Sequence, residues 1–339
     1  MSSEDGDASP DDIVGLSVRE ATDALVSENP ARDPESVRAV LDHVTEDGVV
    51  TRDALEEAFS DASMVLGTAE TRTELASMAL AEARETAAPV SDLETVRARL
   101  DAFESAVTDL QRRATDLGSD LQTLVRRRDD SGSIYDLVTD LRRVTSDAKT
   151  VQRTADALQT DLEAFERWAT DADARFRELD ADADALERSL DASANVVEKL
   201  ADGDESGRET LSLPTTDDAV AADAAWADAT LRLRVVELLV ADARAELADL
   251  RRWADRENDR DAAFDARAEE LERRFDELDE KRETLGRRLD ALGRPAWRER
   301  HGDRLSGFDA ALDDFEPPVA WGDVRGVLER YRPALEGAA

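Results

Sequence analysis

Apolar residues recur at alternating spacings of three and four along three long stretches of this chain. The first stretch runs from Leu93 to Leu124, the second from Ile134 to Leu200, and the third from Ala219 to Leu292. The second keeps its phase throughout, with Ser193 as its one polar position. A strict seven-residue repeat predicts supercoiled helices, because a straight helix would drift about 20° per heptad. Disordered chains keep no such phase, so the pattern argues against disorder.

These seams predict an all-α fold built on a long antiparallel coiled-coil hairpin. Its arms are residues 133–200 and 217–292, and each would be roughly 100 Å long at 1.5 Å per residue. The turn is expected at residues 201–216, where Pro214 cannot continue a helix. An antiparallel dimer would bury the same seams, and the sequence leaves both arrangements open.

The rest of the chain divides by composition into shorter segments. We expect a helix over 93–124 to return along the open end of the hairpin and form a three-helix bundle there. The other expected segments are a disordered acidic tail (1–12), a small helical module (13–66), helices that pack on the rod (67–128) and an aromatic-rich helical cap (295–336).

Within the small module, the sequence carries several local signals. Ser17 with Glu20 has the spacing of a capping box, and Asp33 precedes a proline in the first turn of a second helix. Val49 and Val50 indicate a short extended piece, and Thr51 is placed to cap a third helix.

The third seam has three polar positions, Glu257, Asp261 and Arg282. They could form a proton relay or a metal site. Setting the register is the favoured interpretation, because a polar seam residue penalises misaligned pairing.

The stretch 231–239 is apolar beyond the width of one seam. We expect another helix to cover it, with 69–88 the first choice, or a second protomer. Self-association would then use four residues: Leu231, Val235, Leu238 and Leu239.

The excess of acidic residues indicates a high-salt environment. The chain has 81 acidic and 44 basic residues, a formal net charge of −37, and almost all of its basic residues are arginine. This composition is typical of a halophilic cytoplasm, where the screening length at 1 M salt is about 3 Å.

The absence of cysteine excludes disulfides and thiolate chemistry. No signal peptide or membrane-spanning run is present, so we expect a cytoplasmic protein without membrane insertion.

Basic residues gather in windows that the hairpin would bring to its open end. They form a possible docking patch for an acidic partner, made of Arg126, Arg127, Arg128, Arg142, Arg143, Arg287, Arg288 and Arg294. Neutralisation by neighbouring acids is the favoured alternative, because solvated charged faces are usual on coiled coils.

No pattern in the sequence points to catalysis. It has no phosphate-binding glycine loop, nucleophile elbow or HExxH motif. The segment from His43 to Ala54 echoes a calcium loop, but only Asp47 of the four expected carboxylates is present. The same module could be a degenerate helix-turn-helix, yet its acidity argues against DNA binding. We therefore expect no enzyme, catalytic residue, cofactor or metal.

Two segments resemble a known group of proteins. They are Glu46-Asp47-Gly48-Val49-Val50-Thr51-Arg52-Asp53-Ala54-Leu55 and Asp161-Leu162-Glu163-Ala164-Phe165-Glu166-Arg167-Trp168. On these, the chain resembles haloarchaeal coiled-coil proteins labelled halo transducer protein, a label that implies signal transduction.

Three functions are compatible with the sequence. The first is a scaffold or adaptor that mediates protein–protein interaction. The second is a soluble transducer-like component of signal transduction. The third is a nucleic-acid-associated protein that uses the basic open end, which the acidic balance of the chain disfavours.

Overall fold

The computed structural model describes residues 13–129, 133–209, 216–257 and 260–332. Over these residues the fold is all-α, as the heptad pattern predicts. Its α-helices are α1 (Val18–Glu28), α2 (Pro34–Leu41), α3 (Arg52–Ala87), α4 (Glu94–Asp129), α5 (Ile134–Thr170), α6 (Ala172–Glu209), α7 (Thr216–Glu257), α8 (Ala262–Leu292), α9 (Pro295–Leu312) and α10 (Trp321–Tyr331). Short 3-10 turns η1 (Asp42–Val44) and η2 (Ala88–Val90) and strands β1 (Thr45–Glu46) and β2 (Val49–Val50) complete it.

The chain divides into two compact units. The first unit comprises Met1–Glu85 and Phe103–Phe165, and the second comprises Thr86–Ala102 and Glu166–Ala339. Helices α4 and α5 therefore contribute residues to both units.

The small module at the start of the first unit is held by local capping. The Ser17 side chain accepts from the backbone N–H of Glu20 to begin α1, and the Glu20 carboxylate accepts from the Ser17 N–H. Asp33 caps α2 in the same way, accepting from Ser36 N at 2.8 Å. Asp47 and Gly48 take positive φ values of 50° and 79° in the turn that joins β1 to β2, a conformation that glycine adopts without steric cost.

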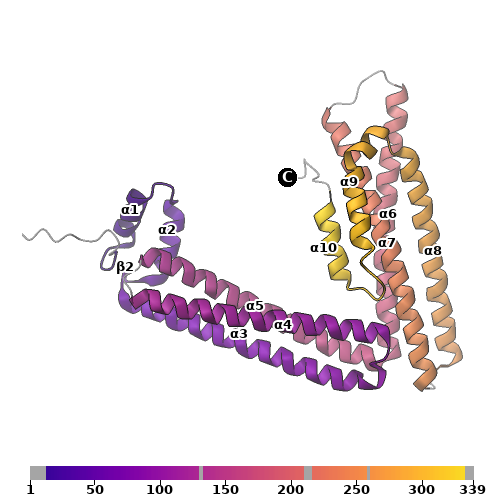
Figure 1. The fold of residues 1–339 in the computed structure, drawn as a ribbon. Coiled ribbons are helices and arrows are strands. Elements are labelled where there is room, and N and C mark those ends of the chain that lie inside the picture. The colour runs from indigo at the N-terminus through magenta and orange to yellow at the C-terminus, as the bar shows by residue number, and fades with distance from the viewer. Residues whose placement is uncertain (1–12, 130–132, 210–215, 258–259, 333–339) are drawn as a thin grey trace, which may run out of the picture. The chain divides into compact units, whose positions relative to one another are not determined.

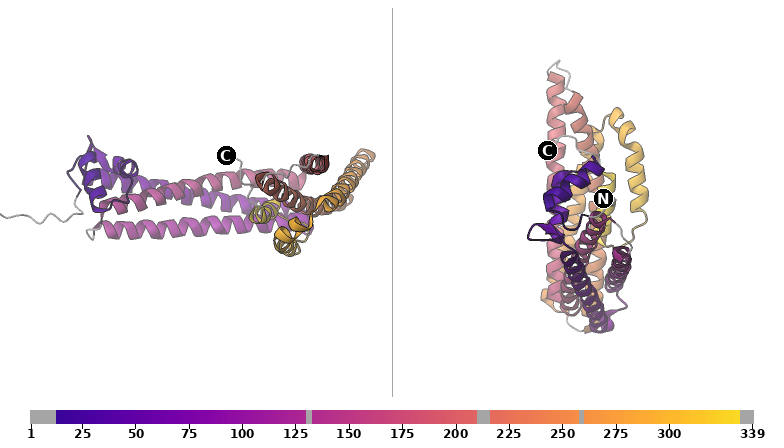
Figure 2. Two further views of the ribbon diagram at one scale, coloured as in Figure 1. Left: turned by 90° about the horizontal axis from the view of Figure 1, so that it is seen from above. Right: turned by 90° about the vertical axis from the view of Figure 1, so that its left-hand side faces the viewer.

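Helices α3, α4 and α5 lie side by side in the first unit (Figures 1 and 2). Gln152 of α5 donates to the Val65 carbonyl of α3 at 2.6 Å, and Arg84 of α3 pairs with Glu104 of α4 at 2.5 Å. The rings of Phe103 and Phe165 meet edge-on with centroids 5.5 Å apart. The result is a three-helix bundle with a core of leucine, valine and alanine.

Helix α3 crosses the expected boundary between segments 13–66 and 67–128. It begins at Arg52 and continues without a break to Ala87. Gly67 does not end the helix, because one internal glycine costs only about 1 kcal/mol.

The second unit is a bundle of α6, α7 and α8. Ion pairs fix the direction of α8: Arg267 reaches Asp180, Arg274 reaches Glu187 and Lys281 reaches Asp191. Residue numbers rise together along both helices, so α8 runs parallel to α6. Arg244 pairs with Asp279, and Arg251 pairs with Glu272, so α8 is antiparallel to α7.

The arrangement differs from two uninterrupted arms over 133–200 and 217–292. The first expected arm ends at Thr170 and restarts as α6 at Ala172, and the second divides between Glu257 and Ala262. The spacing of apolar residues could not reveal the first break. Only Asp171 lies between α5 and α6, and the seven-residue repeat continues through it without a shift. Two three-helix bundles also bury each seam against two neighbours, which removes more apolar surface from water than a two-helix contact.

The expected turn over 201–216 is shorter than predicted. Helix α6 continues to Glu209 and α7 begins at Thr216. Residues 210–215 lie outside the described residues, as do the tail 1–12 and the last residues of the segment 295–336.

Helices α9 and α10 cover the broad apolar surface of α7. Leu231, Val235 and Leu239 are buried there, and Leu238 is half-buried. The expectation that 69–88 would cover this surface is wrong, since those residues belong largely to α3 and α9 and α10 contact α7. Self-association through these four residues loses its basis, because the chain itself covers them.

Among the described residues, no helix is both long enough and apolar enough to cross a membrane.

Candidate functional site: a buried charge network

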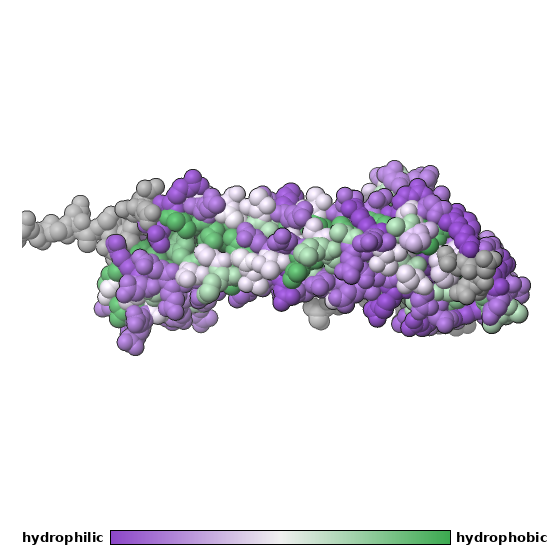
Figure 3. All heavy atoms as spheres, turned by 90° about the horizontal axis from the view of Figure 1, so that it is seen from below, coloured by the Kyte–Doolittle hydropathy of each residue, from purple (hydrophilic) through white to green (hydrophobic). Residues whose placement is uncertain are grey.

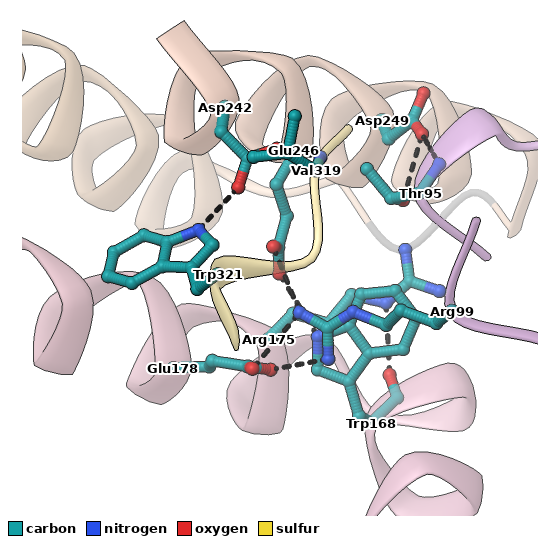
Figure 4. Close-up of polar contacts among 10 residues, drawn as sticks. All are labelled: Thr95, Arg99, Trp168, Arg175, Glu178, Asp242, Glu246, Asp249, Val319 and Trp321. Carbon is teal, nitrogen blue, oxygen red and sulfur yellow. Dashed lines mark hydrogen bonds and ion pairs between the residues drawn. The ribbon is translucent and has the colours of Figure 1, made fainter. Parts of the chain in front are cut away.

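The second unit encloses a group of charged side chains between α4, α6 and α7 (Figure 4). Arg99 of α4 is at its centre. Its guanidinium donates to both carboxylate oxygens of Glu178 on α6, at 3.1 and 3.0 Å, and to Glu246 on α7 at 3.1 Å. Bidentate pairs of this kind combine strength with fixed geometry. Arg99 thereby connects three helices.

Trp168, near the end of α5, joins the same group. Its indole N–H donates to Glu246 at 3.1 Å, and the Arg99 guanidinium lies over its ring, 4.0 Å from the centroid. Both oxygens of Glu246 therefore accept hydrogen bonds, which offsets the cost of burying its charge.

Arg175 explains how the chain tolerates the break at Asp171. Its side chain is fully buried and donates to the backbone carbonyls of Trp168 and Ala169, at 3.0 and 3.3 Å. Carbonyls in the last turn of a helix lack intrahelical partners. The guanidinium also lies 4.3 Å from the Trp168 ring centroid and 5.3 Å from that of Trp253.

Asp249 of α7 caps a helix from outside it. Its carboxylate accepts from both the backbone N–H and the hydroxyl of Thr95, each at 2.8 Å, at the start of α4. Nearby, Arg256 and Asp92 form a two-point ion pair with both distances at 2.6 Å. These contacts attach the start of α4 to α7.

Asp242, one turn before Glu246, holds the segment that precedes α10. It accepts from the backbone N–H of Val319 at 2.8 Å and from the Trp321 indole at 2.6 Å. The charge network therefore has a contact with the C-terminal helices as well.

Burial and like charges change the acidity of this group. Burial, together with the charges of Glu246 and Glu178, raises the pKa of Asp182 to about 7. Burial likewise raises the pKa values of Glu246 and Asp242. Desolvation lowers the pKa of Arg175 to about 10. Asp182 can therefore take up a proton close to neutral pH.

These contacts show what the network does chemically. Each hydrogen bond described above goes to another element of the same fold, so the charges connect α4, α5, α6, α7 and the segment before α10. Among the described residues, no group of three His, Asp or Glu side chains is placed to hold a metal ion.

Sequence reasoning missed this site. Arg99, Arg175 and Glu246 are separated by long stretches of chain and lie among many similar acids and arginines. The one local signal was Asp171, a residue favoured at helix N-caps; its side chain accepts from Asp173 N at 2.9 Å.

The three polar seam positions have different surroundings. Asp261 is not on a continuous seam, because it caps α8 by accepting from Phe264 N at 2.8 Å. Glu257 ends α7. Arg282 pairs with Asp279 on its own helix and with Glu237 of α7, at 3.1 and 3.3 Å, and is the one whose contacts bear on register.

The residues of the expected basic patch belong to different units. Arg126, Arg127, Arg128, Arg142 and Arg143 are in the first unit, and Arg287, Arg288 and Arg294 are in the second. Several have acidic or carbonyl partners close by. Arg127 pairs with Asp140 at 2.7 Å, Arg142 donates to the Ala39 carbonyl at 3.1 Å, and Arg287 pairs with Glu283 at 3.6 Å. No single unit assembles the patch as predicted.

An open groove lies between α3 and α5 of the first unit. Its volume is about 560 Å³. Apolar lining comes from Ala58, Met64, Val65 and Leu141, while Glu57 and Asp61 on α3 and Arg142 and Lys149 on α5 supply charges of both signs. His43 and Thr45, from the segment that echoes a calcium loop, also line it.

Comparison with known proteins gives no relative. No protein-family model matches this chain, and neither a curated protein nor a solved structure is similar to it.

Proposed function

We propose that this protein is a non-enzymatic scaffold or adaptor of a halophilic cytoplasm that holds protein partners on the outer surface of its helices. The observation that supports this proposal is the groove between α3 and α5, whose lining combines apolar side chains with charges of both signs. Such a surface suits an amphipathic helix, whose apolar face contacts the apolar lining while its polar side chains meet the charged residues.

The buried charge network supports the same proposal from the second unit. Its hydrogen bonds join elements within the fold, which gives a rigid body for presenting a surface. The antiparallel coiled-coil hairpin remains part of the proposal in a shortened form, with α6 and α7 as its arms.

Blocking the groove tests this function. Ser146 lines the groove and is exposed on α5, so Ser146→Trp places a large ring across it. We expect the variant to lose partners that the unaltered chain retains when cross-linked and recovered from cell extract in molar salt. Quantitative mass spectrometry of the recovered proteins gives the measurement.

The neighbouring residue supplies the control. Asp147 is exposed on the same helix and does not line the groove, so Asp147→Trp should retain the partners. An identical set of proteins from all three chains would contradict the proposal. Recovery of nucleic acid would favour the nucleic-acid alternative, and recovery of a receptor–kinase complex would specify a signalling adaptor.

A further inference from the structure

The outward face of α3 carries an apolar stripe with its own heptad spacing. The stripe consists of Met64, Thr68, Thr71, Leu75 and Met78, which follow one another at intervals of four, three, four and three. Met64 is 61% exposed, Leu75 38% and Met78 63%. The residues that α3 buries in the bundle, such as Leu66, Thr73 and Leu80, lie on the opposite side of the helix.

The two threonines of the stripe use their hydroxyl hydrogens within the helix. The Thr68 hydroxyl donates to the Met64 carbonyl at 2.9 Å, and the Thr71 hydroxyl donates to the Gly67 carbonyl at 2.8 Å. The donor of each hydroxyl is therefore satisfied within the helix, and the stripe carries no charge along its length.

Charge avoids this face of α3. Asp61 before the stripe and Glu82 after it are the nearest charges along its line, and Arg72 is turned aside to Asp156 of α5 at 3.3 Å. The other helices of the bundle expose charged side chains, for example Asp109, Arg112 and Asp116 on α4 and Asp147 and Arg153 on α5. Figure 3 views the first unit from below, the side on which α3 lies in Figure 1, and shows hydrophobic and weakly polar surface along it.

We propose that a second copy of this chain binds this stripe, with the two α3 helices antiparallel. An exposed stripe with heptad spacing pairs with another helix that has the same spacing. Because this stripe carries no charge, the partner helix must also present an uncharged stripe. Antiparallel coiled coils place unlike seam positions opposite each other, so Met64 faces Leu75 of the second copy and Thr68 faces Thr71. A two-fold axis then generates the same contacts twice.

The flanking charges agree with this alignment. Arg72 faces Gly67 of the second copy, Glu70 faces Ala69 and Glu74 faces Val65, so no like charges meet in the central heptads. The apolar contact is confined to these heptads, because the same register places Met78 opposite Asp61 of the second copy at each end. Glu57 faces Glu82 at each end, a repulsion that salt screens. The seam is roughly 20 Å long at 1.5 Å per residue, which is short for a stable interface. We expect a weak dimer that strengthens with protein and salt concentration.

Cysteine cross-linking tests both the dimer and its direction, because the natural chain has no cysteine. A mixture of the Met64→Cys and Leu75→Cys chains should form a disulfide-linked dimer under mild oxidation. Either variant alone should cross-link far more slowly. In the antiparallel pair, identical positions are about 16 Å apart along the helix at 1.5 Å per residue, beyond the reach of a disulfide.

Light scattering gives an independent measurement in molar salt. The mass of the unaltered chain should rise from monomer towards dimer with concentration, and Leu75→Glu should remain monomeric. Val125→Glu, at a 36% exposed apolar position on α4, is the matched control and should still dimerise. Retained helicity shows that each variant is folded.

Two results would overturn the inference. One is a monomeric mass at every concentration, together with a mixture that cross-links no faster than the single variants. The other is rapid self-cross-linking of Met64→Cys, which would indicate parallel helices. Met64 lines the groove, whereas Leu75 does not. Leu75→Glu therefore tests the dimer without altering the groove, and Ser146→Trp tests the groove without altering the stripe, so the two failures are distinguishable.

Discussion

At the residue scale, the second unit places charged groups where an ordinary core has apolar ones. Arg175, Glu246 and Asp249 are each buried. Removing one partner of such a group leaves another buried charge uncompensated, which is costly, whereas the intact group contributes little net stability. These charged groups specify the geometry of the bundle, because each finds its hydrogen-bond and ion-pair partners in only one arrangement of the helices.

Proton uptake by Asp182 gives the unit a specific pH dependence. A carboxyl whose folded pKa is about 7 binds a proton that the unfolded chain releases above about pH 4. Its contribution to stability therefore decreases as pH rises from about 4 to about 7. Asp182→Asn should stabilise the unit by about 1–2 kcal/mol at pH 8, after allowance for solvent screening, and by little at pH 5. Denaturant unfolding followed by tryptophan fluorescence measures this difference.

A neighbouring aspartate provides the control for that measurement. Hydrogen bonding to Arg274 lowers the pKa of Asp184, so Asp184→Asn should give no stabilisation at pH 8. Equal effects of Asp182→Asn at both pH values would show that Asp182 is ionised in the folded chain.

At the element scale, helix ends decide where the long seams are interrupted. At the end of α5, Arg175 donates hydrogen bonds to the free backbone carbonyls. Asp261 caps the start of α8, and the Asp249 carboxylate accepts from the Thr95 N–H at the start of α4. Each interruption thus has a side chain that satisfies the exposed backbone groups.

The cap that Asp249 provides can be measured directly. Asp249→Ala should lower the free energy of unfolding of the second unit by about 1–3 kcal/mol, because two buried donors of Thr95 lose their acceptor. Asp249→Asn retains an acceptor oxygen and should cost less. Equal losses for the two variants, in denaturant unfolding followed by tryptophan fluorescence, would rule out the capping role.

At the scale of the whole molecule, the two units have separate cores. All five tryptophans, at positions 168, 226, 253, 297 and 321, belong to the second unit. Tryptophan fluorescence therefore reports on that unit alone, while the far-ultraviolet circular dichroism signal reports on the helices of both.

We expect the two signals to disagree during denaturant unfolding. The circular dichroism signal should fall in two steps, and fluorescence should follow only one of them, the step that Asp249→Ala shifts. Superimposable transitions for the unaltered chain and for Asp249→Ala would show that α4 and α5, which run through both units, make unfolding a single event.

The sequence by itself determined the helical class, the heptad seams and several helix starts. Seam residues such as Leu162, Leu247 and Phe275 are buried as the repeat predicts, because periodicity follows directly from helix geometry. Ser17 and Asp33 begin helices as expected, because capping depends on residues close together in the chain.

Only the tertiary structure decided how the seams pair. A seven-residue repeat states which face of a helix is buried, but not whether the helix continues or which neighbour it meets. The one-residue break at Asp171, the return of α8 alongside α6 and the cover of Leu231 by the C-terminal helices depend on contacts between distant residues. The charge network has the same origin, since Arg99, Glu178 and Glu246 become partners only when three helices meet.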